Sequence, residues 1–332
     1  MKAAVYGING LSIMDVDKPK LSKNEVLIKV HKAGICGTDK AIVSGDFIVP
    51  KPLIIGHEFS GIIEEVAPNI SREVIGKRVV SEINIVCHKC YFCLINEKTH
   101  CLNRKALGID INGAFAEYVK VPFENIYFIP DNISMDEATF IEPIAACIRS
   151  FEIVSFKPKD NIVILGPGPI GLLSMQIAKK YGIGKVIVLG TKKDRLKIAK
   201  ELGADITINV LEENYIEKVL KETNGIGADI VIEATGNPEG ISEAIKLVRS
   251  RGKIIMKTTC GKHSNINATE LVVKEIELIG TRCGPFDKAI DMLAKKEVEV
   301  LKLISHRFQL ENILEAFKLI NERKALKILI EI

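Results

Sequence analysis

Hydrophobic and polar positions change their rhythm near the middle of the chain. Up to about residue 145, short apolar runs are broken by Gly, Pro and Asn, which is typical of an irregular, mostly antiparallel β domain. From about residue 160, short β-branched runs alternate with longer helical stretches. This alternation predicts βαβ crossovers and a doubly wound parallel sheet, so the fold class is α/β.

The pattern also places the individual elements. Strands of the first region are expected at 26–30, 62–66, 78–83 and 118–121. Strands of the parallel sheet are expected at 162–165, 186–189, 206–208, 230–232, 253–256 and 277–279. A tail with a helix at 286–296, a strand at 306–308, a helix at 310–320 and a strand at 326–330 follows, and the pattern alone does not say which domain it joins.

Length and charge narrow the class of protein. A chain of 332 residues suits two domains with full hydrophobic cores. The net charge is only +4, and Lys and Arg are interspersed with Asp and Glu, so we expect neither nucleic acid nor a membrane surface as a partner. We find no secretory leader pattern and no apolar run long enough to span a bilayer, and we therefore expect a soluble, cytoplasmic protein.

Four of the eight cysteines share one short polar stretch with the spacing C-x2-C-x2-C-x7-C. They are Cys87, Cys90, Cys93 and Cys101. Four thiolates complete the tetrahedral shell of a structural Zn²⁺ and leave no position for water or substrate. We predict a zinc lobe at 87–101 that stabilises the fold without taking part in chemistry. The alternative is a redox or disulfide cluster, which requires an oxidising compartment.

A glycine-rich loop follows the first predicted parallel strand and opens a helix. Its G-x-G-x-x-G pattern allows a tight turn, close approach of a pyrophosphate and close packing of the helix, whose N-terminus favours negative charge. In this strand-loop-helix context the pattern predicts NAD(P) binding. The loop residues expected to contact the cofactor are Gly166, Gly168, Pro169, Ile170 and Gly171.

The end of the second parallel strand discriminates between NADP and NAD. NAD sites place Asp or Glu there to bind the ribose 2′-hydroxyl, whereas this chain has Gly190. Glycine leaves room for a 2′-phosphate, which Thr191, Lys192 and Arg195 can bind, so NADP is favoured and NAD remains the alternative. In that alternative, the two cations belong to the solvated face of the next helix, and Asp194 turns back to a ribose hydroxyl.

Two further segments carry metal-ligand chemistry, Cys36-Gly37-Thr38-Asp39 and Gly56-His57-Glu58. Together with the cysteine lobe and the nucleotide loop, they resemble the zinc-dependent medium-chain alcohol and polyol dehydrogenase family, which includes sorbitol-, glucose- and threonine-dehydrogenase-like members. The segments 114–119 and Glu233-Ala234-Thr235-Gly236 add to the resemblance. It implies a GroES-like catalytic domain at 1–148, a Rossmann domain at 149–283 and a segment at 284–332 that returns to the catalytic domain.

The resemblance also implies a second, catalytic zinc. The implied ligands are Cys36, His57, Glu58 and Glu142. Glu142 matches the third ligand of the family, with Cys147 as a less favoured substitute, while Glu58 either coordinates directly or stays outside the ligand shell. Asp39 is expected to hydrogen-bond His57 and to fix its orientation.

Other residues are assigned by the same resemblance. Thr38 matches a hydroxyl that relays the alcohol proton, although a turn hydroxyl bonded to nearby backbone is the alternative. Ala41 stands where many members have His, so proton release must use water or another group. Cys260 either lies near the reaction centre or fills space. Residues implied to contact the cofactor are Thr235, Thr258, Thr259 and Lys327, the last with an exposed strand lysine as its alternative.

The sequence therefore predicts a zinc-dependent oxidoreductase. It transfers hydride between an alcohol, polyol or sugar hydroxyl and NADP, with two zinc ions per chain, and the resemblance implies a homo-oligomer, either dimer or tetramer. An amino-alcohol or sugar-phosphate dehydrogenase, similar to threonine or galactitol-phosphate dehydrogenases, is the first alternative. A zinc-stabilised nucleotide-binding regulatory protein is the second. The substrate itself is not identified by any residue.

Overall fold

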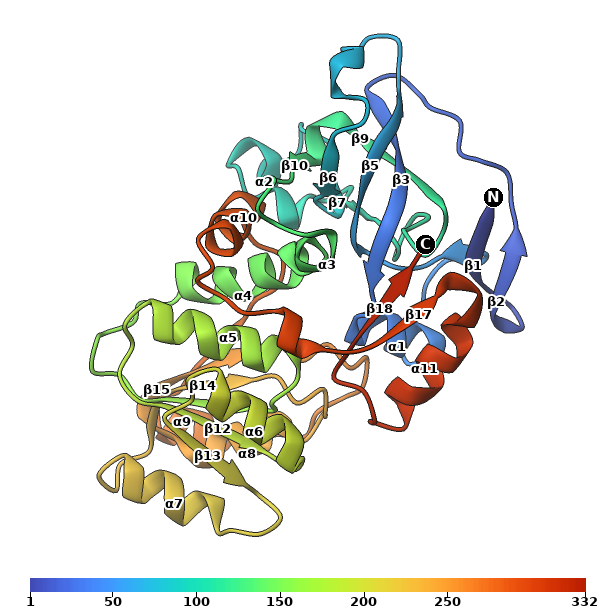
Figure 1. Cartoon of the computed structure of the whole chain (residues 1–332). Helices are drawn as coiled ribbons and strands as arrows, with labels where there is room; N and C mark the ends of the chain where they lie inside the picture. Colours follow the sequence, from blue (N-terminus) through green and yellow to red (C-terminus); the bar gives the residue numbers. More distant parts are fainter. The chain divides into compact units, whose positions relative to one another are not determined.

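The chain forms two compact units in a computed structural model that describes residues 1–332 (Figure 1). Unit 1 comprises residues 1–142 and 304–332, and unit 2 comprises residues 143–303. Unit 1 is rich in β structure, and unit 2 contains a parallel sheet with helices. The predicted α/β fold class is confirmed. None of the helices is long and apolar enough to cross a bilayer.

Unit 1 is built on a largely antiparallel sheet with the order β10-β6-β5-β3-β18-β17, and β9 also pairs with β3. The strands of unit 1 as a whole are β1 (Lys2–Gly7), β2 (Gly10–Asp15), β3 (Glu25–Gly34), β4 (Leu53–Ile54), β5 (Glu58–Val66), β6 (Arg78–Ser81), β7 (Asn84–Ile85), β8 (Lys105–Ala106), β9 (Tyr118–Pro122), β10 (Ile126–Phe128), β17 (Ile304–Gln309) and β18 (Lys327–Glu331). Its helices are α1 (Gly37–Val43), α2 (Tyr91–Leu94), α3 (Met135–Ala138) and α11 (Ile313–Asn321).

The C-terminal tail belongs to the sheet of unit 1. Strand β18 pairs antiparallel with β3, so that Leu329 lies opposite Gly34. Residues 284–303, which the sequence placed with the tail, lie instead in unit 2. There Gly284 packs against the backbone of Ala145, and Lys288 forms an ion pair with Glu152 at 2.6 Å. The helix α4 (Ile141–Ile153) begins in unit 1 and continues into unit 2.

Unit 2 has a six-stranded sheet with the order β13-β12-β11-β14-β15-β16. Its strands are β11 (Ile162–Leu165), β12 (Val186–Gly190), β13 (Ile206–Asn209), β14 (Ala228–Glu233), β15 (Val248–Met256) and β16 (Glu277–Gly280), and its further helices are α5 (Pro169–Lys180), α6 (Lys193–Glu201), α7 (Tyr215–Glu222), α8 (Gly240–Leu247), α9 (Ala268–Val273) and α10 (Phe286–Ala294). All neighbouring strands are parallel. The strand order reverses between β11 and β14, and in such sheets ligands bind at the carboxyl ends of the strands beside this point.

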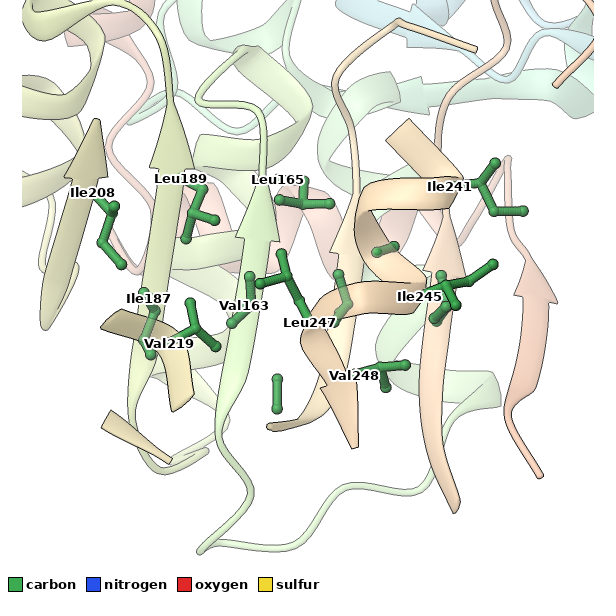
Figure 2. Packing of buried hydrophobic residues seen from close by; sticks show 14 residues of the cluster. Val163, Leu165, Ile187, Leu189, Ile208, Val219, Ile241, Ile245, Leu247 and Val248 are labelled. Atoms are coloured by element: carbon green, nitrogen blue, oxygen red, sulfur yellow. The ribbon is translucent and has the colours of Figure 1, made fainter. Parts of the chain in front are cut away.

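The core of unit 2 explains why its central strands β11 and β12 are apolar throughout. Figure 2 shows Val163 and Leu165 of β11 on one face of the sheet, within the same cluster as Ile245 of α8 and Val219 of α7. The alternate residues of β11 point to the opposite face, where Ile164 is also fully buried. A strand that is covered on both faces needs an unbroken apolar run, which is the pattern that predicted β11 and β12.

Candidate active site and cofactor loop

Strand pairing in unit 1 brings together three metal-ligating side chains. Cys36 follows the end of β3, and Glu58, the first residue of β5, lies opposite Gly34 in the β3–β5 register. His57 immediately precedes Glu58. The Cys36 sulfur, a His57 ring nitrogen and a Glu58 carboxylate oxygen lie within 4.8 Å of one another. We call these three residues the catalytic cluster.

Two glycines create the space for this cluster. Gly56 has a φ of +96°, and a Cβ there would lie 2.8 Å from the ring of Phe115. Only glycine adopts this left-handed conformation readily. A Cβ on Gly34 would lie 2.7 Å from a Glu58 carboxylate oxygen, so a larger residue there would displace that side chain.

Asp39 in α1 connects two members of the cluster. Its Oδ2 accepts a hydrogen bond of 2.8 Å from the Cys36 backbone N–H. Its Oδ1 lies 3.3 Å from His57 Nδ1, yet the geometry is not that of a hydrogen bond, and both atoms are buried without another partner. The hydrogen bond expected between Asp39 and His57 is therefore not formed, although the carboxylate faces the ring.

The electrostatics of the cluster fit a cationic metal. Burial raises the pKa of the Cys36 thiol, and the Glu58 carboxylate raises it further. Burial alone would lower the pKa of His57, but Asp39 and Cys36 outweigh it and raise that pKa well above its usual value. Thiolate, imidazole and carboxylate are the donors that Zn²⁺ takes in proteins, and metal binding displaces protons from such groups.

A buried lysine completes the surroundings of Glu58. The Lys327 ammonium forms an ion pair with the Glu58 carboxylate and donates a hydrogen bond of 3.0 Å to the Ile35 carbonyl. Lys327 is only 3% exposed, so the alternative of an exposed strand lysine is wrong. Burial lowers its pKa, but Glu58 and Cys36 outweigh burial and raise that pKa above its usual value. Local sequence gave no signal for this pairing.

Three other residues that were considered for the catalytic site lie outside the three-residue cluster. Glu142 lies in the first turn of α4 and is not one of the three residues of the cluster. Cys147 is buried further along α4, with its sulfur 3.6 Å from the Ile170 carbonyl, which fits a core residue and not a zinc ligand. Thr38 is half-buried in α1, and its hydroxyl makes no hydrogen bond, so the turn-hydroxyl alternative is not observed.

The four-cysteine lobe forms a second cluster, with all four sulfurs within 4.8 Å of one another. The Cys90–Cys93 and Cys87–Cys101 sulfur pairs are each 3.5 Å apart, and all four residues are free thiols. A disulfide needs about 2.0 Å between sulfurs, so the disulfide alternative is wrong. Hydrogen bonds from the Lys89 backbone and the Asn103 side chain lower the pKa of Cys87 to about 6, which favours a metal-binding thiolate.

In unit 2, the glycine-rich loop lies at the carboxyl end of β11. Gly166 has a φ of +95°, and a Cβ there would lie 2.8 Å from the Ala234 carbonyl. Gly168 precedes the first turn of α5, where a Cβ would meet nothing within 4 Å and no side chain caps the helix. The free N–H groups at this helix start and the open space above Gly168 suit the pyrophosphate of a dinucleotide.

The neighbouring strand ends carry the other predicted cofactor contacts of unit 2. Gly190 ends β12, followed by exposed Thr191 and Lys192 and by half-buried Arg195 in α6. After β14, the Thr235 hydroxyl donates a hydrogen bond of 2.5 Å to Glu233. These residues and the loop share the carboxyl edge of the sheet, whereas Lys327 belongs to unit 1.

Thr258 and Thr259 follow β15 at the same edge. The Thr258 hydroxyl accepts a hydrogen bond of 3.0 Å from the Gly236 N–H, which ties the turn after β14 to the turn after β15. Glu233 is fully buried, and its Oε2 has no hydrogen-bond partner. The sequence indicated Glu233 only as part of a motif. It gave no signal that Glu233 holds the Thr235 side chain in place.

A parallel sheet in dinucleotide-binding order and a thiolate–imidazole–carboxylate cluster define a metal-dependent, nucleotide-dependent oxidoreductase. Comparison with known families agrees: residues 22–131 match the alcohol dehydrogenase GroES-like domain, and residues 169–295 match the zinc-binding dehydrogenase family. D-arabitol-phosphate dehydrogenase of Enterococcus avium is 35% identical over 98% of this chain and 95% of its own. The chain belongs to the zinc-dependent medium-chain alcohol and polyol dehydrogenase family.

Solved structures support the same assignment. A protein from Sinorhizobium meliloti 1021 with NADP bound has a TM-score of 0.91 and 28% identity, covering 100% of this chain and 99% of its own. An alcohol dehydrogenase from Escherichia coli CFT073 complexed with NADH has a TM-score of 0.91 and 31% identity, with the same coverage of 100% and 99%. The predictions of an enzyme that oxidises alcohols with NAD(P), and of zinc as a cofactor, are confirmed.

Proposed function

We propose that the chain is an NADP-preferring dehydrogenase of polyols or sugars, with catalytic zinc held by Cys36, His57 and Glu142. The catalytic cluster carries this proposal, because the Cys36 sulfur and the imidazole of buried His57 already converge there. Glu142 would supply the third ligand. The Cys36 thiolate and the Glu142 carboxylate would then neutralise the charge of Zn²⁺. Glu58, paired with Lys327, would remain outside the shell or replace Glu142 when substrate leaves.

When both groups are bound, zinc supplies Lewis acidity to the alcohol and NADP accepts hydride. The protein's own residues then hold and move the proton. Thr38 lies two residues from Cys36 with an uncommitted hydroxyl, so it can accept the alcohol proton and pass it outward. Ala41 cannot continue this path, and water would carry the proton from Thr38 to solvent. Asp39 holds the Cys36 backbone and faces His57, which keeps both ligands in place.

The preference for NADP rests on the end of β12. Gly190 provides no carboxylate to repel a 2′-phosphate. Lys192 is exposed at the start of α6, and Arg195 lies one turn further along. Lys193 forms an ion pair of 2.7 Å with Glu212 and belongs to the helix surface. The hydroxyl of Thr191 and the cationic side chains of Lys192 and Arg195 would bind the phosphate.

Titration with NADPH and NADH, followed by nucleotide fluorescence, tests this preference. We expect tighter binding of NADPH, and Arg195→Ala should remove most of the difference. Lys193→Ala is the matched control because its partner is Glu212, and it should leave the ratio unchanged. Equal affinities of the parent protein for the two nucleotides would contradict the proposal.

The proposed substrate class comes from sequence and from a relative. The run from Cys36 to Gly45 resembles that of sugar-oxidising members, and Ala41 agrees with that group. The D-arabitol-phosphate dehydrogenase named above favours a second candidate, a polyol phosphate. Turnover on matched pairs of polyols and their phosphates, with amino alcohols included, separates the candidates. No nucleotide reduction on any of these substrates by protein with both zinc sites filled would contradict the proposed function.

We also propose that the protein acts as a homodimer or homotetramer in the cytoplasm. None of the eight cysteines forms a disulfide, which suits a reducing compartment. Family membership supports the oligomer. Light scattering coupled to size-exclusion chromatography should give a mass of twice or four times the 36.6 kDa chain, and a monomer would contradict this part of the proposal.

A further inference from the structure

A close approach in unit 2 joins the glycine-rich loop to the end of β12. Pro167 is buried, and its ring occupies the place where a side chain at residue 190 would begin. A Cβ built on Gly190 would lie 2.5 Å from both Cγ and Cδ of Pro167 and 3.4 Å from Leu196 Cδ2. Close-packed interiors do not tolerate carbon–carbon approaches of 2.5 Å, so one of the two residues would have to move.

The proline ring has little freedom to move away. Its closed ring fixes φ, so it cannot rotate aside as a flexible side chain does. The preceding residue, Gly166, donates a backbone hydrogen bond of 2.9 Å to Leu189, the residue before Gly190. On its other side, Gly166 is so close to β14 that a Cβ there would lie 2.8 Å from the Ala234 carbonyl. The loop is therefore held between β12 and β14.

We infer that Pro167 is a specificity-determining residue that excludes an acidic side chain from position 190 and so maintains the preference for NADP. An NAD site needs a carboxylate at the end of this strand to bind the ribose 2′-hydroxyl. Pro167 blocks the first carbon of any such side chain. The cofactor part of this inference rests on the NADP preference proposed above, whereas the steric part concerns the protein alone.

Thermal unfolding without nucleotide tests the steric part. Gly190→Ala adds only the Cβ, and Pro167→Ala removes the two ring carbons that it would meet. Gly190→Ala alone should lower Tm by roughly 2–8 °C, as overpacking does, and in the Pro167→Ala background most of this loss should disappear. Pro169→Ala, in the same loop but outside the Gly190 contact, is the control background and should leave the loss intact. Equal losses in all three backgrounds would overturn the inference.

Fluorescence titration with NADH tests the consequence for specificity. Gly190→Asp alone should gain little NADH affinity, because the aspartate cannot reach its position. The pair Gly190→Asp and Pro167→Ala should bind NADH roughly tenfold more tightly than Gly190→Asp alone, which is the worth of one hydrogen bond to a charged group. Equal NADH affinity of the single and the double variant would overturn the role of Pro167. Equal NADPH and NADH affinity of the parent would instead overturn the proposed NADP preference, and the comparison between variants would still stand.

Discussion

Lys327 and Glu58 form an ion pair that is almost completely buried and that joins the last strand of the chain to the catalytic cluster. The two residues begin strands β18 and β5, and both of these strands pair with β3. Each side chain is 3% exposed or less. The pair therefore couples the position of Glu58 to the docking of the C-terminal strand in the sheet of unit 1.

Removal of one partner should show how strongly this pair supports unit 1. Lys327→Met leaves the Glu58 carboxylate buried without a counterion, and loss of one member of such a pair costs about 3–5 kcal/mol of unfolding free energy. Lys327→Met combined with Glu58→Gln should recover part of that loss. Denaturant unfolding of the zinc-free protein measures both. Lys2→Met, which breaks the exposed pair with Glu311, is the control and should change stability little.

The ion pair also marks the limit of what the sequence predicts. Strands near 62–66 and 326–330 follow from local apolar runs, and both are observed as β5 and β18. Their meeting across β3 depends on long-range pairing, which no local pattern encodes. The glycine-rich loop was predictable because strand, loop and helix are contiguous. The contact of Pro167 with Gly190 was not, since it depends on the packing of two loops at neighbouring strand ends.

The same reasoning applies to the metal ligands. The cysteine lobe was found because its four ligands lie within one short stretch, and their convergence is confirmed. Cys36 and His57 were found only through resemblance, because the segments between them carry no ligand pattern. Glu142 stays a prediction, because it lies in the first turn of α4 and is not one of the three residues that converge in the catalytic cluster.

Zinc analysis of two conservative variants should identify the third ligand. We expect Glu142→Gln to lose the catalytic zinc and retain one zinc per chain, because an amide is a far weaker ligand than a carboxylate. Glu58→Gln should retain two, since Glu58 is held by Lys327. Metal content by mass spectrometry after gel filtration gives the count. The reverse outcome, with zinc lost only from Glu58→Gln, would make Glu58 the resting ligand.

Loss of a thiolate from the cysteine lobe should reduce stability before it affects chemistry. Cys93→Ser removes one of four convergent sulfurs, so the protein should lose one zinc per chain and unfold at a lower temperature. Zinc content and Tm measure the two effects. Cys260→Ser, whose residue lies outside both clusters, should retain full zinc content. A Cys93→Ser protein that kept both metals and its stability but lost turnover would show that the roles of the two sites are exchanged.

Substitution of Thr38 should impair turnover without loss of metal or nucleotide. Thr38→Val keeps the shape of the side chain but removes the hydroxyl, and loss of a proton-transfer group costs roughly a hundredfold or more in kcat. Thr38→Ser restores a hydroxyl and should recover most of the rate. Zinc content and NADPH affinity serve as controls and should not change. If Thr38→Val kept its kcat across the pH range, the relay would not pass through this residue.

Glu82, just beyond β6, should give unit 1 a pH-dependent stability. Burial raises its pKa, with a further increase from Glu124, while Asn84 and Lys98 act in the opposite direction. Because the folded pKa exceeds the unfolded value, the folded protein binds the proton more tightly, and stability is lost as pH rises through this interval. Glu82→Gln removes this loss, so it should raise Tm at pH 7 and have little effect near pH 4, about where free glutamate titrates. Glu73→Gln, at an exposed position, is the control and should follow the parent at both pH values. An equal gain from Glu82→Gln at both pH values would mean that packing, and not charge, sets the effect.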